Sequence, residues 1–178
     1  HYLTPADYGV LNYVNSIFVF LPILSTLSLS SYLLRFFSEQ GSNHNKKLLV
    51  GNIFLFIAFF NFFVVCFAFF YMPSVLDYFK VDIPWDPFFK LSLITFFFDI
   101  FSIVPLAYLR VNQKAKIFVF FSVGKVLLQY IIILIFIVRF EMGVIAYFYG
   151  NLIASVPFFI IAWIIILKNS LLAHLVNL

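Results

Sequence analysis

The chain has 178 residues, of which 65% are hydrophobic, 22% aromatic and only 10% charged, with a formal net charge of +4 and a mean hydropathy of +1.10. A soluble domain is about half apolar and about a quarter charged because its surface faces water, so this composition excludes a soluble globular enzyme domain. It also excludes a disordered chain, which requires low hydrophobicity.

Five apolar runs follow one another along the chain, each long enough to cross the roughly 30 Å hydrocarbon core of a bilayer as a helix. They cover residues 8–34, 48–72, 88–109, 117–138 and 143–167. Strands of a membrane barrel would alternate apolar and polar side chains, and these runs do not. The sequence therefore predicts an all-α polytopic transmembrane helix bundle, with residues 1–178 forming a single transmembrane domain.

The start of the chain does not look like a signal peptide. The first residue is His1 rather than Met, and the first apolar run begins within ten residues of it. This run is longer than the roughly 7–15 apolar residues of a signal peptide, and no basic segment precedes it. We therefore expect the chain to be a piece of a longer protein.

Basic residues are unevenly shared between the two ends of the predicted bundle. Three lie on the side of the connection 72–87, namely Lys80, Lys90 and Arg139. Seven lie on the side of the connections 38–47 and 110–116, namely Arg35, Lys46, Lys47, Arg110, Lys114, Lys116 and Lys168. Because cytoplasmic loops carry the excess of Lys and Arg, we expect the seven in the cytoplasm and the start of the chain outside, in the plasma or inner membrane.

Two charged residues lie deep inside predicted spans, where charges are costly and usually face a partner or a cavity. Asp99 lies ten residues before the end of the third run, and Lys125 lies eight residues after the start of the fourth. The two helices are consecutive and antiparallel, so a rise of 1.5 Å per residue brings both side chains to nearly the same depth. Two compatible interpretations follow, a buried ion pair or the lining of an aqueous path.

Other polar residues recur at helical spacing in four of the five spans. They are Asn12, Asn15, Ser16, Thr26 and Ser30 in the first, Ser92, Thr95 and Ser102 beside Asp99 in the third, Ser122 and Gln129 beside Lys125 in the fourth, and Tyr147, Asn151 and Ser155 in the fifth. One such stripe usually joins helices by hydrogen bonds. Stripes on four helices, one with an acid and one with a base, predict a shared polar interior. Pro22, Pro105 and Pro157 mark positions where these helices can kink.

The sequence contains no motif of catalytic or metal-binding chemistry. The histidines lack ligand spacing, Cys66 is the single cysteine, and no phosphate-binding glycine-rich loop is present. Basic loop residues occur without interleaved exposed aromatics, so nucleic acid is not an expected partner. We therefore expect a protein that is not an enzyme and that has no cofactor, metal or catalytic residue.

Short motifs in the chain resemble those of a known transporter family. The segment Leu3-Thr4-Pro5-Ala6-Asp7-Tyr8-Gly9-Val10-Leu11 resembles the L-x-P-x-[ED]-[YF]-G segment that precedes the second helix of polysaccharide flippases. These are the O-antigen and oligosaccharide translocases of the multidrug/oligosaccharidyl-lipid/polysaccharide exporter superfamily. Residues 108–116 look like their short basic turn between helices four and five, and Gly143 is similar to the small residue that opens helix six. Ser30–Arg35 matches the end of their helix two only in part.

The resemblance implies a two-lobed membrane transporter that moves lipid-linked sugars by alternating access. The chain would form spans two to six, which is most of the N-terminal lobe. Its expected partners are a polyprenyl-phosphate-linked oligosaccharide such as a lipopolysaccharide precursor, membrane lipids and the C-terminal lobe of the same protein. The family resemblance also implies an orientation in the membrane, and it is the same as the one that the basic residues predict.

In such a transporter, Lys125 is the best candidate for binding the anionic group of the substrate, as a deep point charge. Asp99 would hold Lys125 in place or carry a coupling proton or Na⁺. Polar interior candidates are Gln129, Asn15 and Asn151. Arg35 and Arg110 would attract the pyrophosphate at the cytoplasmic mouth and Arg139 at the outer end, although ordinary interfacial anchoring also explains these three.

Three other functions compete with the flippase. A multidrug or small-cation exporter of the same superfamily would favour an acidic, aromatic interior, against which Lys125 argues. A membrane-embedded glycan polymerase or glycosyltransferase would need a large extramembrane loop, and the longest loop here has about fifteen residues. A purely structural membrane subunit is the third alternative.

Overall fold

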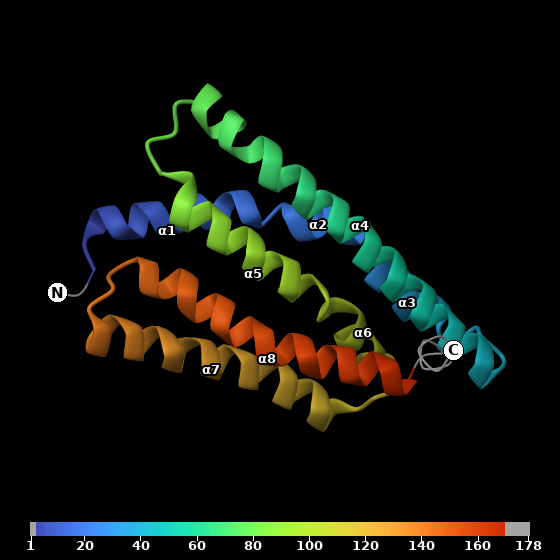
Figure 1. Ribbon diagram of the computed structural model, residues 1–178. Coiled ribbons are helices and arrows are strands. Elements are labelled where there is room, and N and C mark those ends of the chain that lie inside the picture. Colours follow the sequence, from blue (N-terminus) through green and yellow to red (C-terminus); the bar gives the residue numbers. More distant parts are fainter. Residues whose placement is uncertain (1–2, 170–178) are drawn as a thin grey trace.

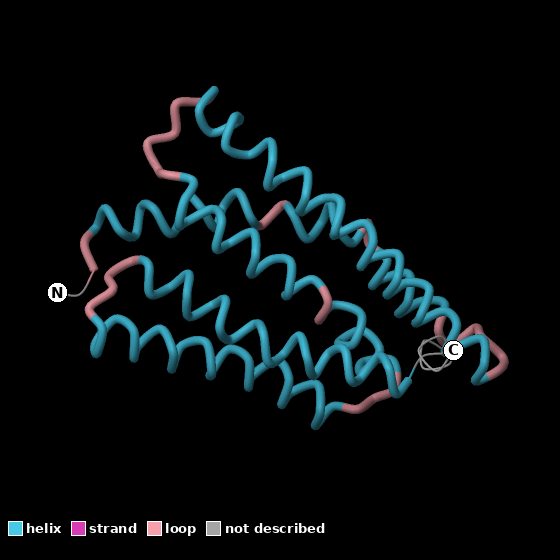
Figure 2. Tube along the Cα trace, in the orientation of Figure 1, coloured by secondary structure: helices cyan, strands magenta, loops and turns pink. Residues whose placement is uncertain are grey.

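The computed structural model describes residues 3–169, and all regular structure in that range is helical (Figures 1 and 2). The elements are α1 (Pro5–Phe18), α2 (Leu21–Thr26), α3 (Leu29–Phe36), α4 (Asn43–Tyr78), the π-helical turn η1 (Trp85–Phe89), α5 (Lys90–Ile100), α6 (Ile103–Val111), α7 (Ala115–Phe140) and α8 (Ile145–Asn169). Five helical segments in this range are long and apolar enough to cross a membrane. The predicted all-α polytopic bundle is therefore confirmed.

The motif at the start of the chain is the start signal of the first helix. The Thr4 side chain accepts a hydrogen bond from the Asp7 amide at 3.3 Å, and the Asp7 carboxylate accepts one from the Thr4 amide at 2.7 Å. Pro5 occupies the first helical position, where its missing amide hydrogen costs no intrahelical bond. The residues of the L-x-P-x-[ED] motif therefore form a capping box.

The first span is not the single helix over residues 8–34 that its apolar run predicts. The helix stops at Phe18, resumes at Leu21 as α2, and stops again before α3. At the second break Leu27 and Ser28 have φ of 45° and 58°, a left-handed conformation that is costly for residues other than glycine. The part of this run that is long and apolar enough to cross a membrane is consequently Pro5–Thr26, and α3 is a separate helix beyond it.

The third span, predicted as one helix over residues 88–109, is also interrupted. It opens with η1, and α5 ends at Ile100 before α6 begins at Ile103. Pro105 lies in the first turn of α6, where helices tolerate proline. Pro157, by contrast, lies inside the continuous helix α8. The loops and breaks are shown in pink in Figure 2.

The helices α7 and α8 run antiparallel, and α8 lies between α7 and α5 (Figure 1). A row of small residues four apart on α8, Ala146, Gly150 and Ala154, is buried. A Cβ atom at Gly150 would meet the Ile133 side chain of α7 and come within 3.2 Å of the Ile133 backbone nitrogen. Small residues allow this close backbone approach, which drives helix association where lipid removes the hydrophobic force.

The main apolar core lies between α3, α4, α5 and α6. Leu33, Ile57, Leu93 and Val104 are among its buried residues, each at most 1% exposed. At 36 residues α4 is about 54 Å long, which exceeds the roughly 30 Å of a bilayer core. This helix therefore extends past the membrane boundary on at least one side.

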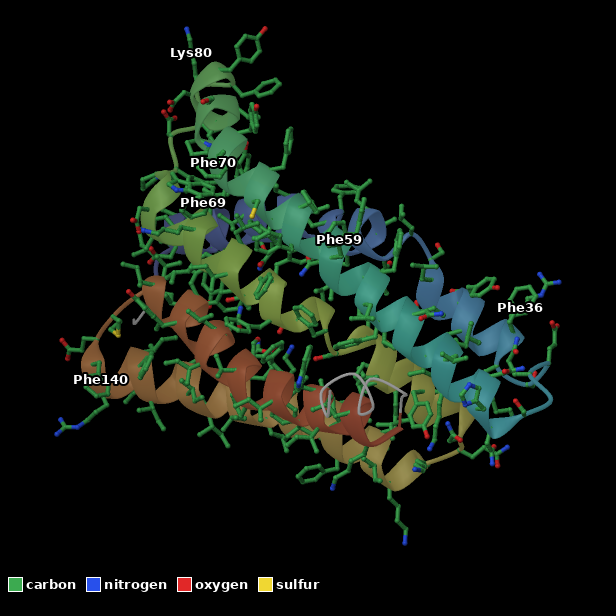
Figure 3. All side chains as sticks on the ribbon, turned by 45° about the vertical axis from the view of Figure 1, so that its right-hand side comes forward. Phe36, Phe59, Phe69, Phe70, Lys80 and Phe140 are labelled. Carbon is green, nitrogen blue, oxygen red and sulfur yellow. The ribbon has the colours of Figure 1, made fainter. Side chains whose placement is uncertain are left out.

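The two ends of the bundle differ in charge. The end with the α3–α4 loop, the α6–α7 turn and the end of α8 carries seven Lys and Arg residues and one acid, Glu39; we name it the basic end. The opposite end carries Lys80, Lys90 and Arg139 together with Asp7, Asp77, Asp82, Asp86 and Glu141; we name it the acidic end. Figure 3 shows Lys80 and Phe140 far from Phe36, at opposite ends of the molecule.

Candidate functional site

An ion pair between α5 and α7 lies in the middle of the bundle. The Lys125 Nζ atom is 2.6 Å from the Asp99 Oδ1 atom, a short charge-assisted hydrogen bond. The Lys125 side chain is 20% exposed and that of Asp99 is 39% exposed. The expected pair therefore forms, and it faces open space rather than a sealed core.

The break in the third span sets the electrostatics of Asp99. This residue lies in the last turn of α5, and its carbonyl accepts the Ser102 amide at 3.0 Å. A helix C-terminus carries a partial negative charge, which disfavours a carboxylate there. Lys125 offsets both negative charges at once. Removal of Lys125 therefore leaves the Asp99 carboxylate without its cation and next to the negative end of α5.

Beside the pair lies a cavity of about 210 Å³ bounded by four helices from three spans. Its walls come from α1, α2, α5 and α8, and consist of Asn15, Phe18, Pro22, Ser92, Thr95, Phe96, Asp99, Phe148 and Asn151. This volume is below the roughly 300–1,000 Å³ of pockets for drug-sized ligands, so it accommodates only one part of a larger molecule.

The polar atoms of the cavity wall are mainly hydrogen-bond acceptors. The Ser92 hydroxyl donates to the Phe88 carbonyl of η1 at 2.9 Å and the Thr95 hydroxyl to the Leu91 carbonyl of α5 at 2.8 Å, which leaves their oxygens able to accept. The Asn151 Oδ1 atom is buried without a hydrogen-bond partner, and the Asp99 carboxylate faces the same space. The cavity therefore suits a group that donates several hydrogen bonds, such as a set of hydroxyls.

A second contact ties the first span to the fifth at this cavity. The Asn15 Nδ2 atom donates a hydrogen bond to the Tyr147 hydroxyl at 3.1 Å, joining α1 to α8. Asn15 lines the cavity, whereas the Ser16 and Thr26 hydroxyls bond carbonyls of their own helices. The helix break before Ser28 also separates Ser30 from this face. The predicted stripe of the first span is thus reduced to Asn15.

The structure brings together four of the eight residues that the sequence singled out. Asn15, Asp99 and Asn151 line the cavity, and Lys125 reaches it through Asp99. Gln129 is half-buried one turn beyond Lys125 but does not line the cavity.

The three arginines lie away from the cavity, at the two ends of the bundle. The guanidinium of Arg35 lies over the Phe36 ring at 5.4 Å and that of Arg110 over the Phe118 ring at 4.8 Å, both at the basic end. Arg139 is exposed in the last turn of α7, at the acidic end. None of the three contributes to the cavity wall.

Two buried polar residues were missed by the sequence reasoning, Ser25 and Asn61. Ser25 of α2 is fully buried, and its Oγ atom has no hydrogen-bond partner. Asn61 of α4 is fully buried, and its Nδ2 atom donates to the Phe97 carbonyl of α5 at 3.4 Å, while its Oδ1 atom has no partner. Asn61 lies nine residues after Asn52, the other amide side chain of the second apolar run, so the two form no stripe at helical spacing. The sequence signal that could have identified Asn61 is an amide side chain deep in an apolar run. An unpaired polar group in lipid costs on the order of several kcal/mol, so such a residue needs a hydrogen-bond partner.

Comparison with known proteins gives the family. No curated protein and no solved structure matches the chain. The sequence model of the family described as polysaccharide biosynthesis protein matches residues 2–173, nearly the whole chain. Together with the five segments long and apolar enough to cross a membrane, this match indicates a membrane protein of polysaccharide biosynthesis. The chain belongs to the polysaccharide biosynthesis protein family.

Proposed function

We propose that the chain is part of a flippase that moves a lipid-linked oligosaccharide across the cytoplasmic membrane by alternating access. The observation that carries this proposal is the acceptor-lined cavity beside the Asp99–Lys125 pair, inside a membrane-spanning bundle. Membership of the polysaccharide biosynthesis family supports a glycan as the cargo. Ionisable residues inside a membrane bundle commonly mark substrate or ion paths, which supports transport.

Sugar hydroxyls are the part of the cargo that this cavity suits. Each hydroxyl offers a donor to the oxygens of Ser92, Thr95 or Asp99, and the buried Asn151 Oδ1 atom becomes a further acceptor when the helices move apart during transport. At about 210 Å³ the cavity receives one portion of the glycan while the rest lies along the path. The sugar is therefore held mainly by this wall of acceptors.

The phosphate of the cargo would be bound by Lys125 only after the ion pair opens. In the structure the ammonium is held by Asp99 at 2.6 Å, so it offers no free positive charge to the cavity. An arriving anionic group competes with the carboxylate for Lys125. This exchange gives the pair a place in the transport cycle, with Asp99 released when the substrate is bound.

Deletion of the gene for the full-length protein tests the proposal. We expect surface polysaccharide to be lost while the complete lipid-linked unit accumulates on the cytoplasmic side. Unchanged surface glycan with raised drug sensitivity would contradict the proposal and favour a multidrug exporter. Lost glycan without accumulation of the complete lipid-linked unit would indicate an enzyme of its synthesis or polymerisation instead.

The proposed orientation places the basic end in the cytoplasm, following the excess of Lys and Arg there. Single cysteines in a Cys66→Ser background test it, one at Gly41→Cys in the α3–α4 loop and one at Asp77→Cys. A Cβ at Gly41 meets no atom within 4 Å, whereas the neighbouring Ser42 caps α4. An impermeant reagent applied outside should label the second variant and not the first, and the reverse pattern would overturn the orientation.

A further inference from the structure

A second polar cavity, of about 200 Å³, lies at the basic end, far from the Asp99–Lys125 pair along the bundle. It is bounded by the end of α3, the start of α4 and the end of α6. Its walls consist of Phe37, Asn43, Lys46, Lys47, Tyr108 and Asn112. We name it the basic pocket. None of these residues was a site candidate from the sequence.

The aromatic floor of the basic pocket is firmly held. Phe37 is 8% exposed, and its ring packs edge-to-face on Tyr108 with centroids 6.0 Å apart. The Asn112 Nδ2 atom donates to the Tyr108 carbonyl at 2.9 Å. The Lys46 Nζ atom lies 5.4 Å from the centroid of Phe37, within the range of a cation–π interaction. The pocket is thus shaped before any ligand arrives.

The charge around the basic pocket is positive and uncompensated. Lys46 and Lys47 lie at the start of α4, where the helix carries a partial positive charge, and the first turn contains no acid. Within the described residues, the two ion pairs are Lys90–Asp86 and Lys125–Asp99, so neither lysine has a carboxylate partner. Glu39 is the single acid at this end and is exposed in the α3–α4 loop.

The start of α4 also offers backbone donors to an anion. The Ser42 hydroxyl caps the amide of Asn45, and the Ser42 carbonyl accepts the amide of Lys46. The amides of Asn43 and His44, at the first two helical positions, have no intrahelical acceptor. Of these two residues, Asn43 lines the pocket. Two ammonium groups together with the side-chain and backbone amides of Asn43 match the several acceptor oxygens of a phosphate.

We propose that the basic pocket binds the phosphate group of a membrane lipid in the leaflet at the basic end. The position of the pocket favours a phosphate that is carried by a lipid. The apolar surface of α4 begins directly after the two lysines, where Leu48 is 40% exposed. A phosphate held by Lys46 and Lys47 would leave its acyl chains along that surface. The inference concerns lipids in general and does not depend on the cargo of the transporter.

Native mass spectrometry of the purified full-length protein in detergent tests this site, with phosphatidylglycerol as the probe. We expect Lys46→Gln/Lys47→Gln to reduce the bound-lipid signal about tenfold or more, because two charge-assisted contacts are lost. The matched control, Lys116→Gln/Lys168→Gln, removes two charges from the same end outside the pocket and should change the signal less than about twofold. Lys46→Arg/Lys47→Arg should retain most of the binding.

Three results would overturn the inference. Equal loss in the pocket and control pairs would mean a general effect of net charge. An unchanged signal in the pocket variant, with an unchanged melting temperature, would place lipid binding elsewhere. Displacement of the lipid by millimolar inorganic phosphate would mean that the pocket takes free phosphate from solution rather than a lipid-borne group. Retention of the lipid under that competition supports the proposal.

Discussion

The two faces of α8 are built in opposite ways. Toward α7 the helix presents Ala146, Gly150 and Ala154, which bring the two backbones together and leave no space between them. Toward α1 and α5 it presents Phe148 and Asn151, which border an open cavity. A buried acceptor without a partner, such as Asn151 Oδ1, costs about 1–3 kcal/mol. The first face therefore serves stability, and the second keeps an unpaired buried acceptor that can gain a partner only when the helices around it move.

A similar division occurs between two consecutive residues of α7. A Cβ at Gly124 would lie 3.4 Å from the Phe158 ring of α8, so this position is part of the close contact between the two helices. The next residue, Lys125, reaches past α8 to Asp99 on α5. Packing and the polar site thus share one turn of helix, and substitutions there test which role each residue has.

The largest effect is expected from Lys125→Ala. Removing one partner of a fully buried pair costs about 3–5 kcal/mol, and the partial exposure of Asp99 lowers that figure here. The control is Lys90→Ala, because the exposed Lys90–Asp86 pair of 2.9 Å is worth about 1 kcal/mol or less. Thermal unfolding of the full-length protein should show a much larger loss for Lys125→Ala, and equal losses would contradict a structural role for the central pair.

The double variant Asp99→Asn/Lys125→Gln separates scaffolding from substrate binding. Replacing both ions by polar groups of similar size is often close to neutral for stability, so we expect near-normal membrane abundance. We expect transport to stay severely impaired, since the anionic cargo has lost its deep positive charge. A double variant that transports like the wild type would show that the pair is scaffolding alone.

The next effect in size concerns the packed face of α8. Gly150→Ala places a methyl group against the Ile133 side chain and backbone, and overpacking of this kind costs about 1–3 kcal/mol. Gly9→Ala is the matched control, because a Cβ there meets nothing within 4 Å and alanine favours a helix by about 1 kcal/mol over glycine. Thermal melting of the two variants should shift in opposite directions. Equal melting temperatures would mean that α7 and α8 are not held at this distance.

Much of this architecture follows from the sequence because lipid leaves few alternatives. Long apolar runs must form helices, so the five spans were predictable from composition alone. The Asp99–Lys125 pair was predictable from depth, since two antiparallel spans that follow each other in the chain place both groups at one level, although α8 packs between them. Two of the helix breaks lie just before Pro22 and Pro105, the prolines at which the sequence indicated kinks. The break at Leu27 and Ser28 was not predictable, because no proline or glycine lies there and the left-handed conformation of these two residues is set by packing rather than by their own preference.

The residues of the cavity wall were only partly predictable. Helical spacing shows which residues share a helix face, but it does not show which of the faces lines a cavity. Gln129 follows Lys125 by one turn and yet does not line the cavity.

The basic pocket could not be predicted from the sequence for another reason. Lys46 and Lys47 counted only toward the charge bias, and their meeting with Asn112 depends on how α4 packs beside α6.

The smallest effect on stability, and the most informative for function, is expected from Asn151→Ala. The Oδ1 atom of Asn151 makes no hydrogen bond within the described structure, so its removal costs no such contact and relieves a buried polar atom. We therefore expect a melting temperature equal to or above that of the wild type. Transport should fall about tenfold, because the cargo loses one hydrogen bond worth about 1–1.5 kcal/mol in a water-poor site.

Asn12→Ala is the control, since Asn12 is exposed on α1 and lies outside the cavity wall. Export of the glycan is followed by labelling of surface sugar over time, normalised to the amount of each variant in the membrane. A scaffold role for Asn151 predicts lower stability with normal transport per molecule. A cargo-binding role predicts normal stability with slow transport. Normal values of both would remove Asn151 from the site, and the polar wall would then consist of Ser92, Thr95 and Asp99 on α5 and Asn15 on α1.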